Sequence, residues 1–314
     1  MSDKEAVFLS EKWILSHRGA KNIVDPYRPY SWLVEKERTH DGRVEDTGII
    51  FLTNRECPFR CLMCDLWKNT TDETVPPGAI ADQIELALEK MPGVKHLKLY
   101  NSGSFFDVRA IPEAGYDRIA SVVSSMETVI VESHPKFINE KCLKFRDMLK
   151  PELQIAIGLE SVSREILMKL NKKMSPEEFR SSVNYLTANS IKTRAFILLR
   201  PPFLSEDEGI FWAERSIDFA FESGIECCTV IPVRGGNGAM EELAKDGHFK
   251  KADIISLEKV LEYGIGLKKG RVFADTWDLN LFSKCKHCLD ERTERITRMN
   301  LQQEILKPVE CGCS

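Results

Sequence analysis

Three closely spaced cysteines carry the clearest chemical signal in the sequence. Cys57, Cys61 and Cys64 lie in the stretch NRECPFRCLMC and have a Cys-x3-Cys-x2-Cys spacing. Zinc in a structural site takes four protein ligands, whereas three thiolates bind three irons of a [4Fe–4S] cluster and leave the fourth iron open. The spacing therefore favours an iron–sulfur cluster that can bind a further ligand. The alternative is a zinc site that a distant cysteine completes.

The elements that must position this loop are alternating strands and helices. Apolar runs typical of strands cover residues 48–53, 96–100, 128–132, 153–160, 193–199 and 226–233. Helical spacing separates them, as with Ile80, Ile84 and Leu88. Such alternation predicts parallel strands with right-handed helical crossovers. Six units are too few for a closed eight-stranded barrel, so we predict an α/β fold, a partial TIM-like (β/α)6 barrel, with its site at the carboxyl ends of the strands. Residues 271–275 are expected to add a strand at one edge.

The cysteine loop resembles the cluster-binding loop of the radical S-adenosylmethionine (SAM) superfamily, and the predicted barrel agrees with that family. The resemblance implies that Cys57, Cys61 and Cys64 hold a [4Fe–4S] cluster whose open iron chelates SAM. It also implies that one electron from the cluster cleaves SAM to a 5′-deoxyadenosyl radical, which removes a hydrogen from the substrate. An electron donor such as a flavodoxin or ferredoxin is therefore an expected partner.

The resemblance extends to residues that would bind SAM itself. Met63, before the third cysteine, stands where the family places a side chain against adenine. Asn101, Ser102, Gly103 and Ser104 follow the second predicted strand and resemble the loop whose backbone receives the amino group of SAM, although the common Gly-Gly-Glu form is absent. Glu132 and Glu160 lie at the ends of the third and fourth predicted strands. Carboxylates at these positions can bind a ribose hydroxyl or the ammonium group of SAM, or they can orient the substrate.

The superfamily group that this sequence resembles contains the elongator catalytic subunit and the archaeal archaeosine-forming radical SAM enzyme. The resemblance covers roughly residues 40 to 300 and includes KLYNSGSFFD, IAIGLES and FILLRPPFLSEDE. It implies radical modification of a tRNA base or its precursor, with tRNA and a partner modification enzyme as candidate partners. Two alternatives stay open: a radical SAM enzyme that acts on a small metabolite, and a non-catalytic zinc-binding RNA adaptor.

Four further cysteines form two close pairs near the C-terminus. The pairs are Cys285 with Cys288 and Cys311 with Cys313, which together provide four thiolates. A site of this composition can hold structural zinc or an auxiliary iron–sulfur cluster. Zinc is slightly favoured, because the pairs flank a basic helical segment with Arg292, Arg295 and Arg298, which is typical of ribbons that face nucleic acid.

The composition sets the limits within which these sites must work. The chain has 314 residues, 43% hydrophobic and 29% charged, with a net charge of −4 that does not favour purely electrostatic RNA binding. The sequence contains no apolar stretch of about eighteen residues and no signal-peptide pattern, so we expect a cytoplasmic protein without a membrane partner. We predict an irregular lead-in over 1–47, a radical SAM core over 48–270 and a cysteine-rich metal-binding extension over 271–314.

Overall fold

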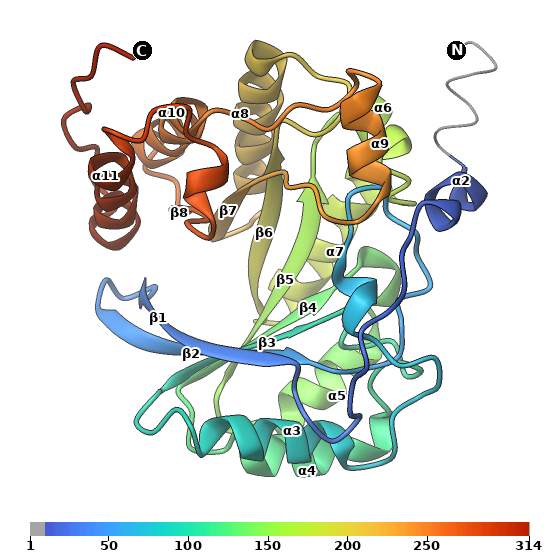
Figure 1. Cartoon of the computed structure of the whole chain (residues 1–314). Helices are drawn as coiled ribbons and strands as arrows, with labels where there is room; N and C mark the ends of the chain where they lie inside the picture. The colour runs from blue at the N-terminus through green and yellow to red at the C-terminus, as the bar shows by residue number, and fades with distance from the viewer. Residues whose placement is uncertain (1–9, 314) are drawn as a thin grey trace.

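The protein folds around one curled sheet of eight strands, whose spatial order follows the order in the sequence. The computed structural model describes residues 10–313. Strand β1 pairs with β2 in antiparallel orientation, and every later neighbour from β2 to β8 is parallel. Figure 1 shows that the sheet curls, with helices on its outer side. The predicted partial barrel is confirmed.

Strands β2 to β8 coincide with the predicted apolar runs to within a few residues at each end. Their continuous hydrophobic pattern reflects burial on both faces, as expected for parallel strands under helices. The bounds are β1 Ser31–Arg38, β2 Val44–Leu52, β3 His96–Asn101, β4 Thr128–Ser133, β5 Glu152–Glu160, β6 Lys192–Leu199, β7 Cys227–Pro232 and β8 Arg271–Ala274.

The helices that connect the strands begin at residues with strong capping preferences. The hydroxyl groups of Ser175 and Ser205 each accept a backbone N–H at the start of a helix. The carboxylates of Glu178 and Glu208 accept the backbone N–H of these serines, which completes two capping boxes. The α-helices are α2 Glu11–Ser16, α3 Ala79–Leu88, α4 Tyr116–Val122, α5 Glu140–Met148, α6 Arg164–Lys169, α7 Pro176–Ala188, α8 Glu206–Glu222, α9 Ala239–Lys245, α10 Ile254–Gly266 and α11 Leu289–Gln302. The short 3-10 helices are η1 Leu66–Asn69, η2 Glu113–Gly115, η3 Pro135–Phe137 and η4 Leu279–Leu281.

The lead-in is not irregular, and that prediction is wrong. It contains helix α2 and the whole of strand β1, which pairs along its full length with β2. The charged residues of β1 obscured it, because Glu35 and Glu37 point to the inside of the curled sheet, where they bind Lys98 and Arg194. Residues 1–9 of the lead-in and Ser314 of the extension lie outside the described residues.

The basic segment near the C-terminus also differs from its prediction. Arg292 and Arg295 lie on α11 with only 3% and 5% of their surface exposed. Both form ion pairs with Glu258 of α10, and Arg295 also binds Glu262. These two arginines therefore join helices inside the protein and do not face nucleic acid, whereas Arg298 is exposed.

Candidate functional site

A cavity of about 770 Å³ occupies the inside of the curled sheet. This volume falls within the range of roughly 300–1,000 Å³ that is typical of small-molecule sites. The cavity extends from the carboxyl ends of the strands, where the cysteine loop lies, down to the ion pairs of Glu35 and Glu37. Its position agrees with the general rule that sites in such folds lie at the carboxyl ends of parallel strands.

All three cysteines of the loop after β2 line this cavity and are free thiols. Two asparagines that the sequence analysis missed hold the loop in place. Asn237 donates to the backbone oxygens of Leu62 (2.7 Å) and Cys64 (3.1 Å), and Asn171 donates to that of Arg60 (2.7 Å). Side chains from two distant parts of the chain thus hold the loop.

The environment of the three thiols fits a polynuclear cluster. Burial raises the pKa of Cys57 and Cys61 to about 11 and that of Cys64 to about 12, so their thiolates require a positively charged metal centre. Among the described residues, the groups whose ligand atoms all lie within 4.8 Å of one another do not include this triplet. Three sulfurs spread wider than around one ion suit a cluster in which each thiolate binds a different iron.

Two glycines leave space that a side chain would fill. Gly103 has φ +124°, and a Cβ there would lie 3.3 Å from the sulfur of Cys57. At Gly158, a Cβ would lie 2.6 Å from Nζ of Lys172. Both glycines line the cavity. Because glycine has no Cβ, the backbone at Gly103 lies close to Cys57, and the backbone at Gly158 lies close to the Lys172 side chain.

Glu160 and Lys172 form a buried ion pair beside the cysteine loop. Their Oε1 and Nζ atoms are 2.5 Å apart, and both residues line the cavity. Glu160 has φ +60°, a left-handed backbone conformation that residues other than glycine seldom adopt. Such conformations are common at functional sites. The sequence analysis did not identify Lys172 as a site residue, because a lysine in a loop, here the loop after α6, is usually exposed to solvent. An adjacent positive and negative charge is complementary to an amino-acid zwitterion.

Glu132 lines the cavity without an ion-pair partner among the described residues. Burial raises the pKa of its carboxyl to about 8, although the backbone N–H of Asn101 donates to it at 3.4 Å. The side-chain amide of Asn101 is buried, and neither its nitrogen nor its oxygen has a hydrogen-bond partner in residues 10–313. A buried amide of this kind is normally completed by a ligand or water.

His134 orders the wall next to Glu132. Its Nδ1 accepts the backbone N–H of Lys136 (3.2 Å), so Nε2 carries the proton and donates to the carbonyl oxygen of Lys172 (3.0 Å). Burial lowers the pKa of His134 to about 3, which keeps the ring neutral. The ring stacks on Phe59 of the cysteine loop at a centroid distance of 4.1 Å.

The predicted SAM-binding residues are placed in two groups. Met63, Asn101, Gly103, Glu132 and Glu160 line the cavity together with the three cysteines. The two serines are buried beside it and have different partners, and Oγ of Ser102 has no hydrogen-bond partner among residues 10–313. The backbone N–H of Ser102 donates to Asn54, and Oγ of Ser104 accepts the backbone N–H of His134.

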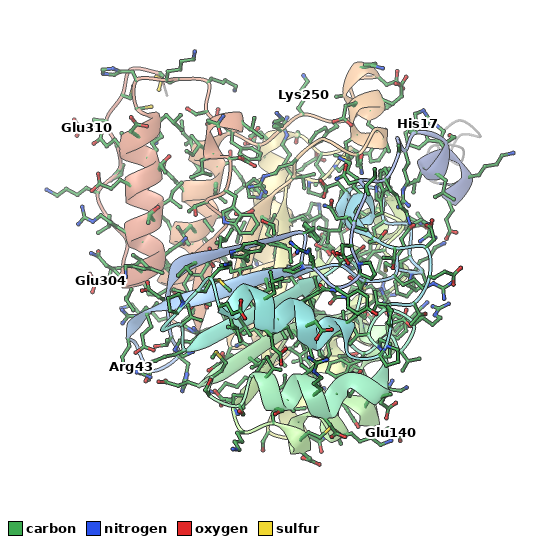
Figure 2. All side chains as sticks on the ribbon, turned by 60° about the horizontal axis from the view of Figure 1, so that its bottom comes forward. His17, Arg43, Glu140, Lys250, Glu304 and Glu310 are labelled. Carbon is green, nitrogen blue, oxygen red and sulfur yellow. The ribbon has the colours of Figure 1, made fainter. Side chains whose placement is uncertain are left out.

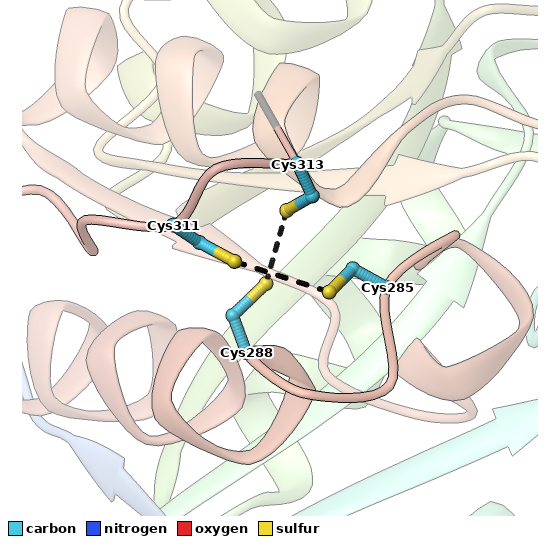
Figure 3. A group of neighbouring side chains, drawn as sticks. All are labelled: Cys285, Cys288, Cys311 and Cys313. Atoms are coloured by element: carbon cyan, nitrogen blue, oxygen red, sulfur yellow. Dashed lines mark hydrogen bonds between the residues drawn. The ribbon is translucent and has the colours of Figure 1, made fainter.

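The C-terminal cysteines converge at the start of α11, outside the cavity. The sulfurs of Cys285 and Cys311 are 3.9 Å apart, and those of Cys288 and Cys313 are 3.5 Å apart (Figure 3). All four sulfurs lie within 4.8 Å of one another, so this group can hold a second metal centre.

Comparison with known proteins identifies the family. The model of the radical SAM superfamily matches residues 51–210, which include the cysteine loop and strands β3 to β6. The chain belongs to the radical SAM superfamily. Members of this family use a [4Fe–4S] cluster and SAM, so the protein is an iron–sulfur enzyme that cleaves SAM by radical chemistry.

Three proteins that are similar in sequence come from archaea. The chain is 27% identical to the uncharacterized protein MJ0550 of Methanocaldococcus jannaschii, over 95% of this chain and 88% of that protein. It is 24% identical to archaeosine synthase subunit beta of Methanosarcina acetivorans, over 81% of this chain and 77% of that subunit. The same subunit of Thermococcus kodakarensis is 25% identical, but only 50% of this chain and 51% of the subunit align.

Solved structures support the fold. Methylornithine synthase (PylB) superposes with a TM-score of 0.56 at 12% identity, over 96% of this chain and 77% of that one. Elp3 of Methanocaldococcus infernus superposes with a TM-score of 0.52 at 16% identity, over 70% of this chain and 59% of that one. Within residues 10–313, no helix is both long and apolar enough to cross a membrane.

Proposed function

We propose that this radical SAM enzyme modifies a base of tRNA, or the precursor of such a base. Cys57, Cys61 and Cys64 would hold the [4Fe–4S] cluster. When bound, the cluster and SAM supply a 5′-deoxyadenosyl radical that removes a hydrogen from the substrate. Two relatives are named subunits of archaeosine synthase, which supports a modified base as the product and a partner subunit in its synthesis.

The observation that carries the substrate class is a layer of aromatic rings below the cysteine loop. The ring of Phe51 lies 6.0 Å from that of Tyr100 and 5.4 Å from that of Trp277, and Tyr100 lies 6.0 Å from Phe196. The aromatic side chains that line this part of the cavity are Tyr30, Phe51, Tyr100, Phe196, Phe273 and Trp277. Flat rings of this kind stack on a flat heterocycle, as in enzymes that bind an extruded base.

The charges of the cavity favour a substrate group without net charge. Each cationic side chain that lines the cavity has a carboxylate partner. These cations are Lys36, Lys98, Lys172, Arg194 and Arg234. A free phosphate or carboxylate would have to break one of these pairs in order to bind, whereas a neutral base would not.

The chain's own groups suit the amino-acid end of SAM. Glu160 would accept hydrogen bonds from the ammonium group and Lys172 would donate to the carboxylate, so that a zwitterion replaces the internal ion pair. Met63 and the backbone at Asn101 and Gly103 would hold the remainder of the molecule. The stacked rings of Phe59 and His134 line the same cavity and would help to exclude water from it, which limits loss of the radical to solvent.

Anaerobic activity assays test this proposal. The protein, reconstituted with iron and sulfide, is mixed with SAM and dithionite, with or without total tRNA. We measure 5′-deoxyadenosine and then analyse the digested tRNA nucleosides by mass spectrometry. We expect 5′-deoxyadenosine and a new nucleoside mass. The Cys57→Ala/Cys61→Ala/Cys64→Ala variant should form neither, and Cys142→Ala, at a buried cysteine of α5, should behave like wild type.

The outcomes separate the chemistry from the substrate. Cleavage of SAM with unchanged tRNA nucleosides, and with no stimulation by tRNA, would refute tRNA as the substrate and favour the free base precursor or another small metabolite. Retained SAM cleavage in the triple variant would refute the assignment of the cluster ligands. Repeating the assay with reduced flavodoxin or ferredoxin in place of dithionite tests the expected electron donor.

A further inference from the structure

We propose that Cys285, Cys288, Cys311 and Cys313 hold a single Zn²⁺ ion, and that this ion locks helix α11 in place as one wall of the active-site cavity. The inference rests on the sulfur positions and on the contacts of α11. It does not depend on the identity of the substrate.

The sulfur spacing fits one metal ion and not a cluster. Four thiolates around zinc at about 2.3 Å form a tetrahedron whose sulfurs are about 3.8 Å apart. The sulfurs of Cys285 and Cys311 are 3.9 Å apart and those of Cys288 and Cys313 are 3.5 Å apart (Figure 3). Both distances are far longer than a disulfide bond of about 2.05 Å. A four-iron cluster places a different iron at each thiolate and spreads the sulfurs further apart.

The surroundings supply the outer support that a thiolate site requires. Zn²⁺ with four thiolates has two excess negative charges, which favours cationic hydrogen-bond donors nearby. Nε of Arg292 donates to the sulfur of Cys288 at 3.3 Å. Arg292 is itself held by Glu258, and both side chains are only 4% exposed. A buried arginine aimed at a cysteine sulfur fits a thiolate ligand better than a neutral thiol.

Helix α11 begins at this site and closes the gap between the two edges of the sheet. It packs against both edge strands, β1 and β8. The amide of Asn300 pairs with the backbone N–H (2.9 Å) and C=O (2.8 Å) of Ala274, and that of Gln303 pairs in the same way with Val272 (2.8 Å each). From the other edge, Arg38 donates to the carbonyl oxygen of Leu301 (3.1 Å). The otherwise free edge of β8 is therefore satisfied by side chains of α11 and of its C-cap residue Gln303.

The same helix contributes directly to the cavity. Thr297, Asn300 and Leu301 are among the residues that line it. After α11 the chain turns back along the helix, so that Glu304 lies near one end and Glu310 near the other (Figure 2). Arg295 holds this return through the carbonyl oxygens of Lys307 (2.7 Å) and Leu306 (2.5 Å). A metal ion that joins the returning tail to the start of α11 closes a loop around the helix.

Metal analysis of purified variants tests the identity of the ion. Wild type, after anaerobic reconstitution, should contain one zinc and four irons per chain. Cys57→Ala/Cys61→Ala/Cys64→Ala should lose the iron and keep the zinc, whose X-ray absorption should show four sulfur neighbours. Cys311→Ser/Cys313→Ser should lose the zinc and keep the iron, and Cys142→Ser should keep both. About eight irons in wild type, a single iron in place of zinc, or unchanged zinc in Cys311→Ser/Cys313→Ser would overturn the proposal.

Hydrogen exchange tests the role of the ion. In Cys311→Ser/Cys313→Ser, amide protection in α11 and β8 should fall by roughly tenfold or more, while β3 to β6 keep theirs. The same loss should follow when a chelator removes zinc from the cysteine triplet variant, in which the C-terminal thiols are intact. Unchanged protection of α11 in both samples would overturn the proposed role, even if zinc is bound.

Discussion

Arg194 on β6 donates two hydrogen bonds to the carboxylate of Glu37 on β1, with N–O distances of 3.1 and 2.5 Å. The two residues are 157 positions apart in the sequence, and their strands are separated in the sheet by β2 to β5. They meet because the sheet curls. Lys98 on β3 joins the pair, at 2.5 Å from Glu37 and 2.5 Å from Glu35. This network closes the floor of the cavity below the aromatic layer.

The network predicts a large cost for removing its central carboxylate. Glu37→Gln would leave Arg194 and Lys98 buried with one carboxylate between them, and we expect a loss of about 3 kcal/mol in the free energy of unfolding. Lys36→Gln is the matched control, since Lys36 is the next residue on β1 and 63% of its side chain is exposed. It should change stability by less than about 0.5 kcal/mol. Denaturant unfolding of the metal-free proteins measures both, and equal effects would contradict the buried network.

The same residues show why part of the fold was not evident from the sequence. Strands β2 to β8 are mainly apolar and were predicted from their runs of apolar residues. In β1 two of the inward positions are Glu35 and Glu37, so this half-buried strand has the sequence of a solvated charged segment. The charged residues of β1 are recognised as inward-facing only when their ion pairs with Lys98 and Arg194 are seen. The sequence does not show that these distant side chains form ion pairs.

The candidate site divides in a similar way. The cysteine triplet and the two carboxylates could be predicted from the sequence, because the triplet follows an apolar strand and Glu132 and Glu160 lie at the ends of two others. Lys172 and Asn237 lie in loops without a periodic pattern, and their importance comes from distant partners. Lys172 binds Glu160, and Asn237 binds the backbone of the cysteine loop.

The raised pKa of Glu132 predicts a pH dependence of stability. The carboxyl has a pKa of about 8 in the folded protein, above its value of about 4.5 when unfolded. Its protonated form is therefore compatible with the fold, and stability should fall as the pH rises from about 5 through 8, while the unfolded state releases the proton. Because Glu132 is partly open to the cavity, we expect a loss of only about 2 kcal/mol from this group.

Glu132→Gln isolates that contribution. The variant keeps a neutral side chain of the same shape and should show a smaller fall in the free energy of unfolding between pH 5 and pH 8.5. Denaturant titrations of the metal-free proteins at both pH values provide the comparison. Identical pH profiles for wild type and Glu132→Gln would show that this carboxyl is ionised in the folded protein at neutral pH.

The Glu160–Lys172 pair predicts a specific effect on SAM binding. Lys172→Met removes the cation proposed to bind the SAM carboxylate and leaves Glu160 unpaired, so the Kd for SAM should rise roughly ten- to hundredfold. Lys173→Met is the control, because Lys173 is the adjacent residue, its side chain is 46% exposed, and it pairs with Glu11 at the surface. Equilibrium binding is measured on reconstituted protein with matched iron content. Equal SAM affinity of the two variants would remove Lys172 from the site.

The aromatic layer predicts that SAM cleavage and substrate modification can be separated. Phe196→Leu removes a ring that lines the cavity and contacts Tyr100, but it keeps an apolar side chain on β6 and should fold normally. Loss of one stacking partner is worth about 1–3 kcal/mol for a bound base, so the yield of modified nucleoside should fall at least about fivefold at subsaturating tRNA. Formation of 5′-deoxyadenosine without tRNA should stay close to wild type, since the SAM-binding residues are unchanged.

Phe211→Leu provides the matched control for that change. Phe211 lies on α8, outside the cavity, and 52% of its surface is exposed. It should modify tRNA as wild type does. If Phe196→Leu lowers both activities in parallel, the ring supports SAM cleavage or the fold and does not select the substrate. If it lowers neither, the aromatic layer is not where the base binds, and the reacting group must enter the cavity along another wall.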